Sequence, residues 1–219
     1  MIPSADWIWD MASGLPDAPD LNADACCQVA HAIGVHPLEA EFDYFTAVDD
    51  NAPEDNAGAG MIGTIEYNAS TLYRYATINV PALIESLGSV DAAAKAVAAF
   101  AESFAVSMPT GKQNTFANRT RPEFFAASIR TDQPVNLVGA FEDAVNSRGS
   151  RVAESVSRLV DHSLDSDKAY GASEPAQSYY LATGNASRAE RLDEFGDVHT
   201  LPEIIEILEA AVQSSGKEN

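Results

Sequence analysis

Two short stretches of the sequence combine residue types that could do chemistry. The first is an acidic group formed by Asp49, Asp50, Glu54 and Asp55. Clustered carboxylates supply the oxygen ligands that Mg²⁺ and Ca²⁺ prefer. The spacing does not match an EF-hand loop, however, and acidic turns are common in a chain this acidic. We therefore predict no metal site there.

The second stretch is residues 110–116, "TGKQNTF". Gly111 lets the backbone approach a ligand closely, and Lys112 supplies a charge directed at phosphate. Gln113 can donate to phosphate or ribose oxygens. An ordinary polar turn on the surface is the other interpretation, and this stretch alone does not decide between the two.

The sequence lacks the usual motifs of catalysis and cofactor binding. It has no G-x-S-x-G, C-x-x-C or H-E-x-x-H pattern, and no Walker A or dinucleotide-binding glycine pattern. We therefore expect a protein that is not an enzyme and that binds no cofactor.

An adjacent aromatic pair, Tyr44 and Phe45, lies in the stretch "EFDYFTAVDD", just before a Gly-rich acidic segment. The stretch alternates like a strand. Its aromatics are either ordinary core residues followed by a solvated turn, or the root of an arm that engages a ligand.

Periodicity and helix-stop signals give a set of elements that would position these residues. We predict helices over 20–36, 90–107, 136–145, 151–164 and 201–213, and strands over 41–48, 71–80, 123–130 and 177–183. The segment of about twenty residues between the first two strands is long for a compact domain. Its weak strand-like patch, "MIGTIEYNAS", predicts a protruding hairpin.

The order helix, strand, strand, helix, strand matches a ferredoxin-like unit that lacks its first strand. We therefore expect an α+β protein. Residues 1–19 form a divergent N-terminal segment, 20–148 a partial palm and 149–219 a mostly helical C-terminal region. Either "DWIWD" substitutes for the missing strand or the chain is the later part of a longer protein, and we favour the second.

The chain is strongly acidic, with a net charge of −20 from 33 acidic and 13 basic residues. Such a surface resists non-specific binding of polyanions, because affinity for nucleic acid comes largely from phosphate neutralisation. The bases are unevenly spread, since Lys112, Arg119, Arg121 and Arg130 share a segment with few acids. Local charge can therefore oppose the global charge.

No run of residues is apolar enough for a transmembrane helix, and the N-terminus does not resemble a secretory signal. Cys26 and Cys27 are neighbours on the predicted first helix, where they cannot pair with each other. We expect unpaired thiols and a cytoplasmic protein without a membrane partner.

Taken together, these stretches resemble the backbone subunit of the type I-E CRISPR Cascade complex. The blocks "DACCQVAHAIGVH", "DYFTAVDD", "TLYRYATINV", "SLG", "GKQNTFA" and "AFEDAV" follow one another as in that family, over residues 20–145. The departure is at the front, because family members carry a long N-terminal half with the first palm strand and basic RNA contacts.

The resemblance implies a modified RNA-recognition-motif palm, helical fingers and a projecting thumb. Several copies would assemble along the CRISPR RNA, and each thumb would displace a nucleotide at regular intervals. The segments left between thumbs would pair with target DNA. The implied partners are thus CRISPR RNA, target DNA, other copies of the chain and other Cascade subunits.

The resemblance also implies site residues. The thumb corresponds to residues 49–70, with aromatics at its base that pack against RNA bases. Such stacking tolerates any sequence, because every base has a π-face. The predicted RNA contacts are Met11, Tyr44, Phe45, Arg74, Lys112, Gln113 and Arg119.

Two alternatives remain open. Related backbone subunits in other CRISPR types cleave target RNA with a thumb aspartate, a role that Asp49 or Asp50 could fill here with a metal ion. A truncated remnant could instead only interact with other Cascade subunits.

Overall fold

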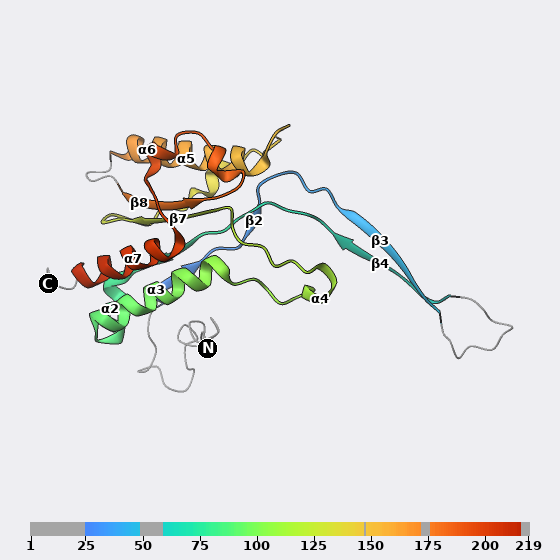
Figure 1. Cartoon of the computed structure of the whole chain (residues 1–219), viewed down its shortest axis with the longest axis horizontal. Helices are drawn as coiled ribbons and strands as arrows, with labels where there is room; N and C mark the ends of the chain where they lie inside the picture. Colours follow the sequence, from blue (N-terminus) through green and yellow to red (C-terminus); the bar gives the residue numbers. More distant parts are fainter. Residues whose placement is uncertain (1–24, 49–58, 147, 172–175, 216–219) are drawn as a thin grey trace.

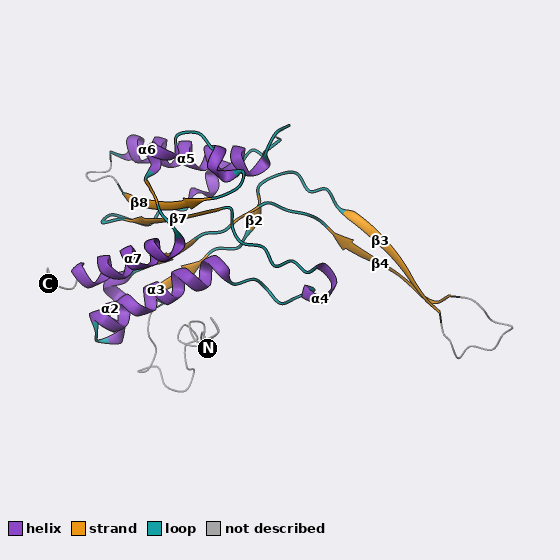
Figure 2. Cartoon of the chain, viewed as in Figure 1, coloured by secondary structure: helices purple, strands orange, loops and turns teal. Residues whose placement is uncertain are grey.

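The computed structural model describes residues 25–48, 59–146, 148–171 and 176–215 and has a layered α+β body with a projecting arm (Figure 1). In the central sheet, β7 (Phe124–Ile129) pairs antiparallel with β8 (Gln177–Ala182), and β9 (Asp197–Val198) adds to β8 in parallel. Helices cover both faces (Figure 2): α5 (Arg151–Tyr170) and α6 (Leu192–Phe195) on one, and α2 (Val80–Leu87), α3 (Val90–Val106) and α7 (Leu201–Ser215) on the other. The predicted α+β class is confirmed.

Two hydrophobic clusters hold these layers together. On one side of the sheet, Val160 of α5 is fully buried in a cluster with Tyr180 and Phe195. On the other side, Ala93 and Ala94 of α3 are fully buried in a cluster that includes Val212 of α7. Alanines carry little side-chain volume, so α3 and α7 can pack closely along their length.

The first predicted helix, over 20–36, is wrong in its described part. Residues 27–34 form two short strands instead, β1 (Cys27–Val29) and β2 (Ile33–Gly34). Both pair antiparallel with partners more than thirty-five residues away, as in the pair Cys27↔Ile78. The apolar spacing fitted a helix, but the β-branched residues Val29 and Ile33 are also common in strands. Pairing with distant residues makes this segment two strands and not a helix. Cys26 and Cys27 form no disulfide, as predicted.

The strand predicted over 71–80 is likewise wrong as a single element. It is divided into β5 (Leu72–Tyr73), which pairs with β2, and β6 (Ala76–Ile78), which pairs with β1. Its end becomes the start of α2, where the Asn79 side chain accepts a hydrogen bond from the Ala82 backbone N–H at 3.1 Å. An asparagine cap followed by Pro81 in the first turn is a helix-start signal that the strand pattern masked.

The remaining predicted elements are close to those observed. The helix over 90–107 is α3, and the strands over 123–130 and 177–183 are β7 and β8. The helix over 151–164 continues to Tyr170 as α5, and that over 201–213 is α7. The helix over 136–145 is only a 3₁₀ turn, η3 (Leu137–Phe141), whose first N–H groups are held by the Tyr73 hydroxyl and the Asn136 side chain.

The arm is a two-stranded hairpin. β3 (Glu41–Val48) pairs antiparallel with β4 (Ala59–Tyr67), and Figure 1 shows both projecting well beyond the layered body. The predicted strand over 41–48 and the protruding hairpin are confirmed. In the predicted ferredoxin-like order, however, the 41–48 strand belonged to the palm, whereas here it lies in the arm. Among the described helices, none is long and apolar enough to cross a bilayer.

Candidate nucleic-acid interface

Tyr44 and Phe45 lie in the middle of the hairpin and not at its root, where the sequence placed them. Their cross-strand partners are Thr64 and Gly63. Successive side chains in a strand point to opposite faces. The two aromatics therefore face opposite sides of the arm and cannot stack on the same base.

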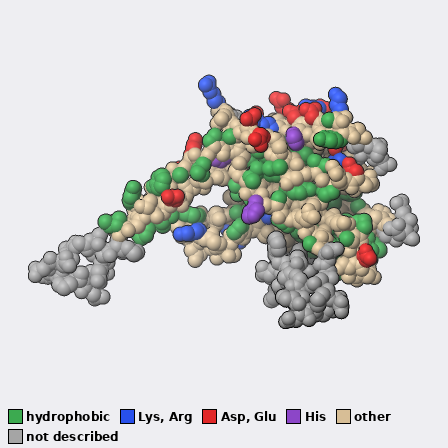
Figure 3. All heavy atoms as spheres, turned by 180° about the vertical axis from the view of Figure 1, so that it is seen from behind, with side chains coloured by type: hydrophobic (Ala, Val, Ile, Leu, Met, Phe, Trp, Pro, Cys, Tyr) green, Lys and Arg blue, Asp and Glu red, His purple; other side chains and the backbone are tan. Residues whose placement is uncertain are grey.

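One face of the arm presents three large exposed apolar side chains, beside Thr46, Thr64 and Glu66. Phe42, Tyr44 and Ile62 have 57%, 76% and 71% of their surface exposed. The register places all three on the same side, because Ile62 is opposite Thr46. Figure 3 shows hydrophobic side chains along the arm. Large apolar side chains held away from the core are typical of an interaction surface.

On the other face, the Phe45 ring lies across Gly63. A Cβ atom built on Gly63 would be 2.7 Å from Cε1 of Phe45 and nearer still to Cζ. Glycine is therefore needed for this close approach. Phe45 is 38% exposed, half as much as Tyr44. Gly63 is a residue that sequence reasoning missed, because its role depends on the pairing register.

The end of the hairpin nearest the body, at Tyr67 of β4, contacts the α4 segment (Gln113–Phe116) through an aromatic pair. The rings of Tyr67 and Phe116 lie 6.0 Å apart at a tilt of 45°. Phe116 ends α4, the short helix formed by the predicted polar loop. A hydrogen bond from the Tyr67 hydroxyl to the Glu41 carboxylate raises the pKa of Tyr67. Tyr67 and Phe116 are both partly exposed, and no motif in the sequence singled them out.

The α4 segment is tightly turned. Lys112 and Ala117 flank the helix with φ angles of 57° and 48°, in the left-handed region that non-glycine residues seldom adopt. Arg119 donates from Nη2 to Oε1 of Gln113 at 2.5 Å. The structure thus brings together three predicted residues: Lys112, Gln113 and Arg119. Backbone strain of this kind often accompanies functional sites.

Several bases of the body form ion pairs, whereas Arg148, Arg151, Lys168 and Arg188 form none among the described residues, like the bases of this segment. On the body, Lys95, Arg130, Arg158 and Arg191 all form ion pairs with carboxylates. Within the described residues, none is formed by Lys112, Arg119 or Arg121. Figure 3 shows basic atoms over α4, beside the arm. Unpaired cations on an acidic protein are available to an anionic ligand.

Arg74 lies elsewhere in the structure. Its guanidinium carbon sits 4.5 Å from the centre of the Phe104 ring on α3, a cation–π contact. Burial lowers the pKa of Arg74. No described contact joins Arg74 to the arm or to α4.

Two of the sequence predictions lie outside the described residues. These are the RNA contact at Met11 and the acidic group of Asp49, Asp50, Glu54 and Asp55. Where the structure describes the chain, no group of three or more metal-ligating side chains could hold a metal ion.

Comparison with known proteins gives the family. Residues 15–207 match the family model of the CT1975-like proteins. No curated protein matches the sequence. Among solved structures, a chain of a "CRISPR RNA-guided surveillance complex, pre-nicking" is 31% identical with a TM-score of 0.81, over 90% of this chain. A chain of a "CRISPR RNA-guided surveillance complex" is 29% identical with a TM-score of 0.82, over 94% of this chain.

The similar chains are longer than this one, which spans 53% of the length of the first and 80% of the second. The family match nevertheless covers most of the sequence. The chain therefore belongs to the CT1975-like family and is a Cas protein related to the subunits of CRISPR surveillance complexes.

Proposed function

We propose that this chain is a CRISPR RNA-binding backbone subunit of a type I-E Cascade complex and has no catalytic role. One observation carries the proposal: an arm with exposed aromatics lies next to basic residues without acidic partners, in a chain of net charge −20. The similar chains belong to complexes described as RNA-guided, which supports the same assignment.

The chemistry of the interface suits a guide RNA of any sequence. Lys112 and Arg119 would neutralise phosphates, a contact that carries no sequence information. Exposed aromatic rings would stack on bases, a contact worth about 1–3 kcal/mol per base and tolerant of sequence. A subunit that must hold every guide needs both kinds of contact and no readout of base edges.

The arm would act as the thumb, over residues 49–70 together with β3. Because Tyr44 and Phe45 face opposite sides, we assign them different roles. Tyr44, on the face with the exposed apolar side chains, would contact a displaced base, whereas Phe45 would support the hairpin across Gly63. Met11 and Arg74 remain proposed RNA contacts.

The body would serve as the RNA-recognition-motif-like palm of the subunit. Several copies would lie side by side along the guide, with target DNA pairing to the segments between thumbs. The proposed partners are therefore CRISPR RNA, target DNA, further copies of this chain and other Cascade subunits, in the cytoplasm.

The test is the salt dependence of RNA binding. Binding of the full chain to guide RNAs with unrelated spacers is measured by fluorescence anisotropy at several salt concentrations. For single strands, each phosphate that the protein neutralises adds about 0.7 to the steepness of log K against log salt. The double variant Lys112→Ala, Arg119→Ala should therefore have a slope shallower by about 1.4, with equal effect on every spacer.

The control is Lys95→Ala, which removes a base that is paired with Asp91 on the exposed side of α3. It should leave the slope unchanged. An unaltered slope in the double variant, or affinities that depend on the spacer sequence, would contradict the proposal.

A further inference from the structure

The two chain segments that connect the hairpin to the body, residues 35–40 before β3 and residues 68–71 after β4, meet where they leave the body. We call them the legs of the hairpin, and their meeting point its root. His36 comes shortly before β3, and Thr71 shortly after β4. The Val35 backbone N–H donates to the Thr71 carbonyl at 3.0 Å, and this hydrogen bond joins the two legs at the root. Between these residues and the hairpin, both legs run as irregular chain (Figure 2).

The His36 ring ties these legs together. Its Nε2 accepts a hydrogen bond from the Thr71 backbone N–H at 3.1 Å. Its Nδ1 lies 2.8 Å from the Pro37 carbonyl. A neutral ring with its proton on Nδ1 satisfies both contacts, since one nitrogen then donates and the other accepts. The side chain thus joins the outgoing leg to the returning one.

Arg151 connects the same ring to the body. Its Nη1 lies 3.0 Å from Nε2 and 3.2 Å from Nδ1 of His36. Arg151 is the first residue of α5. The guanidinium only donates, so with the proton on Nδ1 it can share the Nε2 lone pair with the Thr71 N–H, and its approach to Nδ1 is a contact and not a hydrogen bond. This contact places the imidazole against the first turn of α5.

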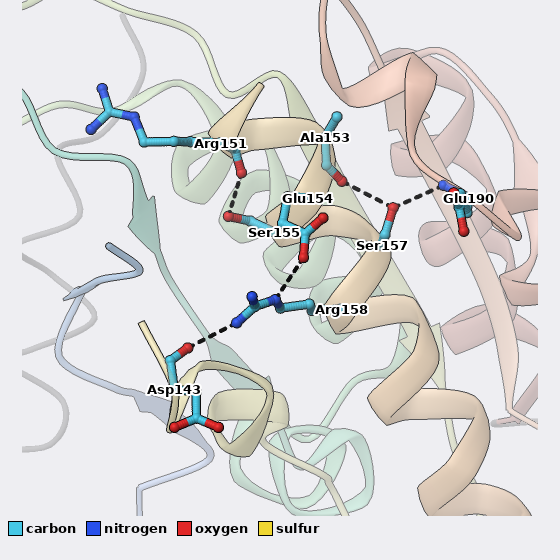
Figure 4. A network of polar contacts seen from close by, with 8 residues as sticks. All are labelled: Asp143, Arg151, Ala153, Glu154, Ser155, Ser157, Arg158 and Glu190. Atoms are coloured by element: carbon cyan, nitrogen blue, oxygen red, sulfur yellow. Dashed lines mark hydrogen bonds and ion pairs between the residues drawn. The ribbon is translucent and has the colours of Figure 1, made fainter. Parts of the chain in front are cut away.

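α5 is joined to the segment before it through Arg158, as the polar network in Figure 4 shows. The Ser155 hydroxyl donates to the Arg151 carbonyl at 2.6 Å, and Arg158 donates to the Asp143 carbonyl at 2.9 Å. The Val145 N–H in turn donates to the Val35 carbonyl at 2.8 Å, and both valines are buried. Arg151 therefore contacts His36, on the leg that leads into β3, from the first turn of α5.

We propose that His36 and Arg151 are positioning residues that set the direction of the hairpin relative to α5. We call His36, Thr71 and Arg151 the root clasp. Small angular errors at the root grow along the arm. A nine-residue strand is roughly 30 Å long at about 3.3 Å per residue, so a tilt of about 10° moves its far end by about 5 Å. The contacts within the chain carry this proposal, so it does not depend on the proposed RNA-binding function.

The test measures the direction of the arm. Spin labels are attached through a non-natural ketone amino acid at Thr64 on the arm and Asp165 on α5, both of which are exposed. This chemistry avoids Cys26 and Cys27. Electron–electron double resonance on the full chain then gives the distribution of label distances. Thr64 lies seven residues from Thr71, roughly 23 Å along an extended chain, so the same tilt of about 10° moves it by about 4 Å. His36→Ala should therefore broaden the distribution by about 4 Å without lowering the thermal midpoint of unfolding.

Further variants separate positioning from general stability. His36→Gln retains an acceptor that can reach Thr71 and should restore the narrow distribution. Arg151→Ala should broaden it, and Arg151→Lys should do so less. Arg188→Ala, which removes an exposed arginine of η4 (Ala186–Arg188), is the matched control and should have no effect.

An unchanged distribution in His36→Ala would overturn the proposal, as would a broadening accompanied by loss of amide protection in α3. If His36→Ala does not fold, Arg151→Ala decides alone, and an unchanged distribution in that variant overturns the proposal equally.

Discussion

At the residue scale, the structure gives several side chains roles that follow from their partners. Lys112 and Arg119 have no carboxylate partner among the described residues, as is also true of Arg148, Arg151, Lys168 and Arg188 on the body. What sets Lys112 and Arg119 apart is their place at α4, which contacts the hairpin through Phe116. Gly63 leaves room for the Phe45 ring of the neighbouring strand. Tyr73 holds the start of the 3₁₀ turn η3 through its hydroxyl. The Tyr73 hydroxyl donates to Oδ1 of Asn136 at 3.0 Å and accepts from the Leu137 N–H at 3.1 Å.

From the raised pKa of Tyr73, we predict that the free energy of unfolding falls at alkaline pH. Burial raises the pKa of Tyr73 to about 12, whereas an unfolded tyrosine titrates near pH 10. The folded state therefore keeps its proton where the unfolded state loses it. This contribution to stability is complete below about pH 10 and disappears as the pH rises toward 12.

The measurement is the free energy of unfolding in urea between pH 9 and pH 12. Tyr73→Phe should be less stable at pH 9 but should lose less stability over this range than the unmodified chain. Tyr170→Phe, at an exposed tyrosine, is the control. Parallel curves for Tyr73→Phe and the unmodified chain would contradict this account.

At the element scale, local sequence signals predicted those elements that local forces determine. α3 follows from an alanine-rich amphipathic pattern and a Ser89 cap, and β7 and β8 follow from alternation. β1 and β2 were mistaken for a helix because their structure depends on pairing with residues far along the chain. The strand 41–48 was predicted correctly, but its place in the palm was not, since alternation does not show which strand pairs with it.

In the candidate site too, residue types could be predicted from the local sequence, whereas contacts between distant residues could not. The sequence predicted Tyr44, Lys112 and Gln113 as RNA contacts by residue type and resemblance, and these remain predictions. It could not place Tyr44 and Phe45 in the middle of the arm, because that required the register with β4. The Tyr67–Phe116 contact and the root clasp join residues 35 or more positions apart. No local pattern signals such a contact.

The hairpin register makes a prediction about Gly63. In Gly63→Ala the new methyl would clash with the Phe45 ring, so the ring must rotate away. Side-chain strain of this kind costs about 1 kcal/mol, or about a fivefold loss of amide protection in the hairpin. Aromatic NMR signals of Phe45 and hydrogen exchange of β3 and β4 measure the two effects.

Gly111→Ala provides the matched control, since a Cβ at Gly111 meets nothing within 4 Å. It should leave the Phe45 signals in place. If Gly63→Ala also leaves them in place, the ring does not lie across Gly63.

At the scale of the whole molecule, shape divides the protein into a layered body and a projecting arm (Figure 1). The layered body carries acidic side chains interspersed with Lys and Arg over α5 and α6 (Figure 3), and some of these bases are ion-paired. With a net charge of −20, the chain repels polyanions. The arm presents aromatic side chains and, on β3 and β4, the acids Glu41, Asp43 and Glu66 without any lysine or arginine. The α4 segment beside it presents Lys112 and Arg119. The acidic body thus disfavours non-specific RNA binding, and the proposed interface is confined to one side of the molecule.

Nuclease protection of guide RNA by the full chain tests most directly whether this arm organises the guide. If copies assemble along the guide with a thumb at regular intervals, protection should be periodic and the same for unrelated spacers. Tyr44→Ala combined with Phe45→Ala should weaken assembly and reduce the periodic pattern, because the arm loses its aromatic side chains there. Unprotected RNA, or an unchanged periodic pattern in the double variant, would contradict the claim that this arm organises the guide.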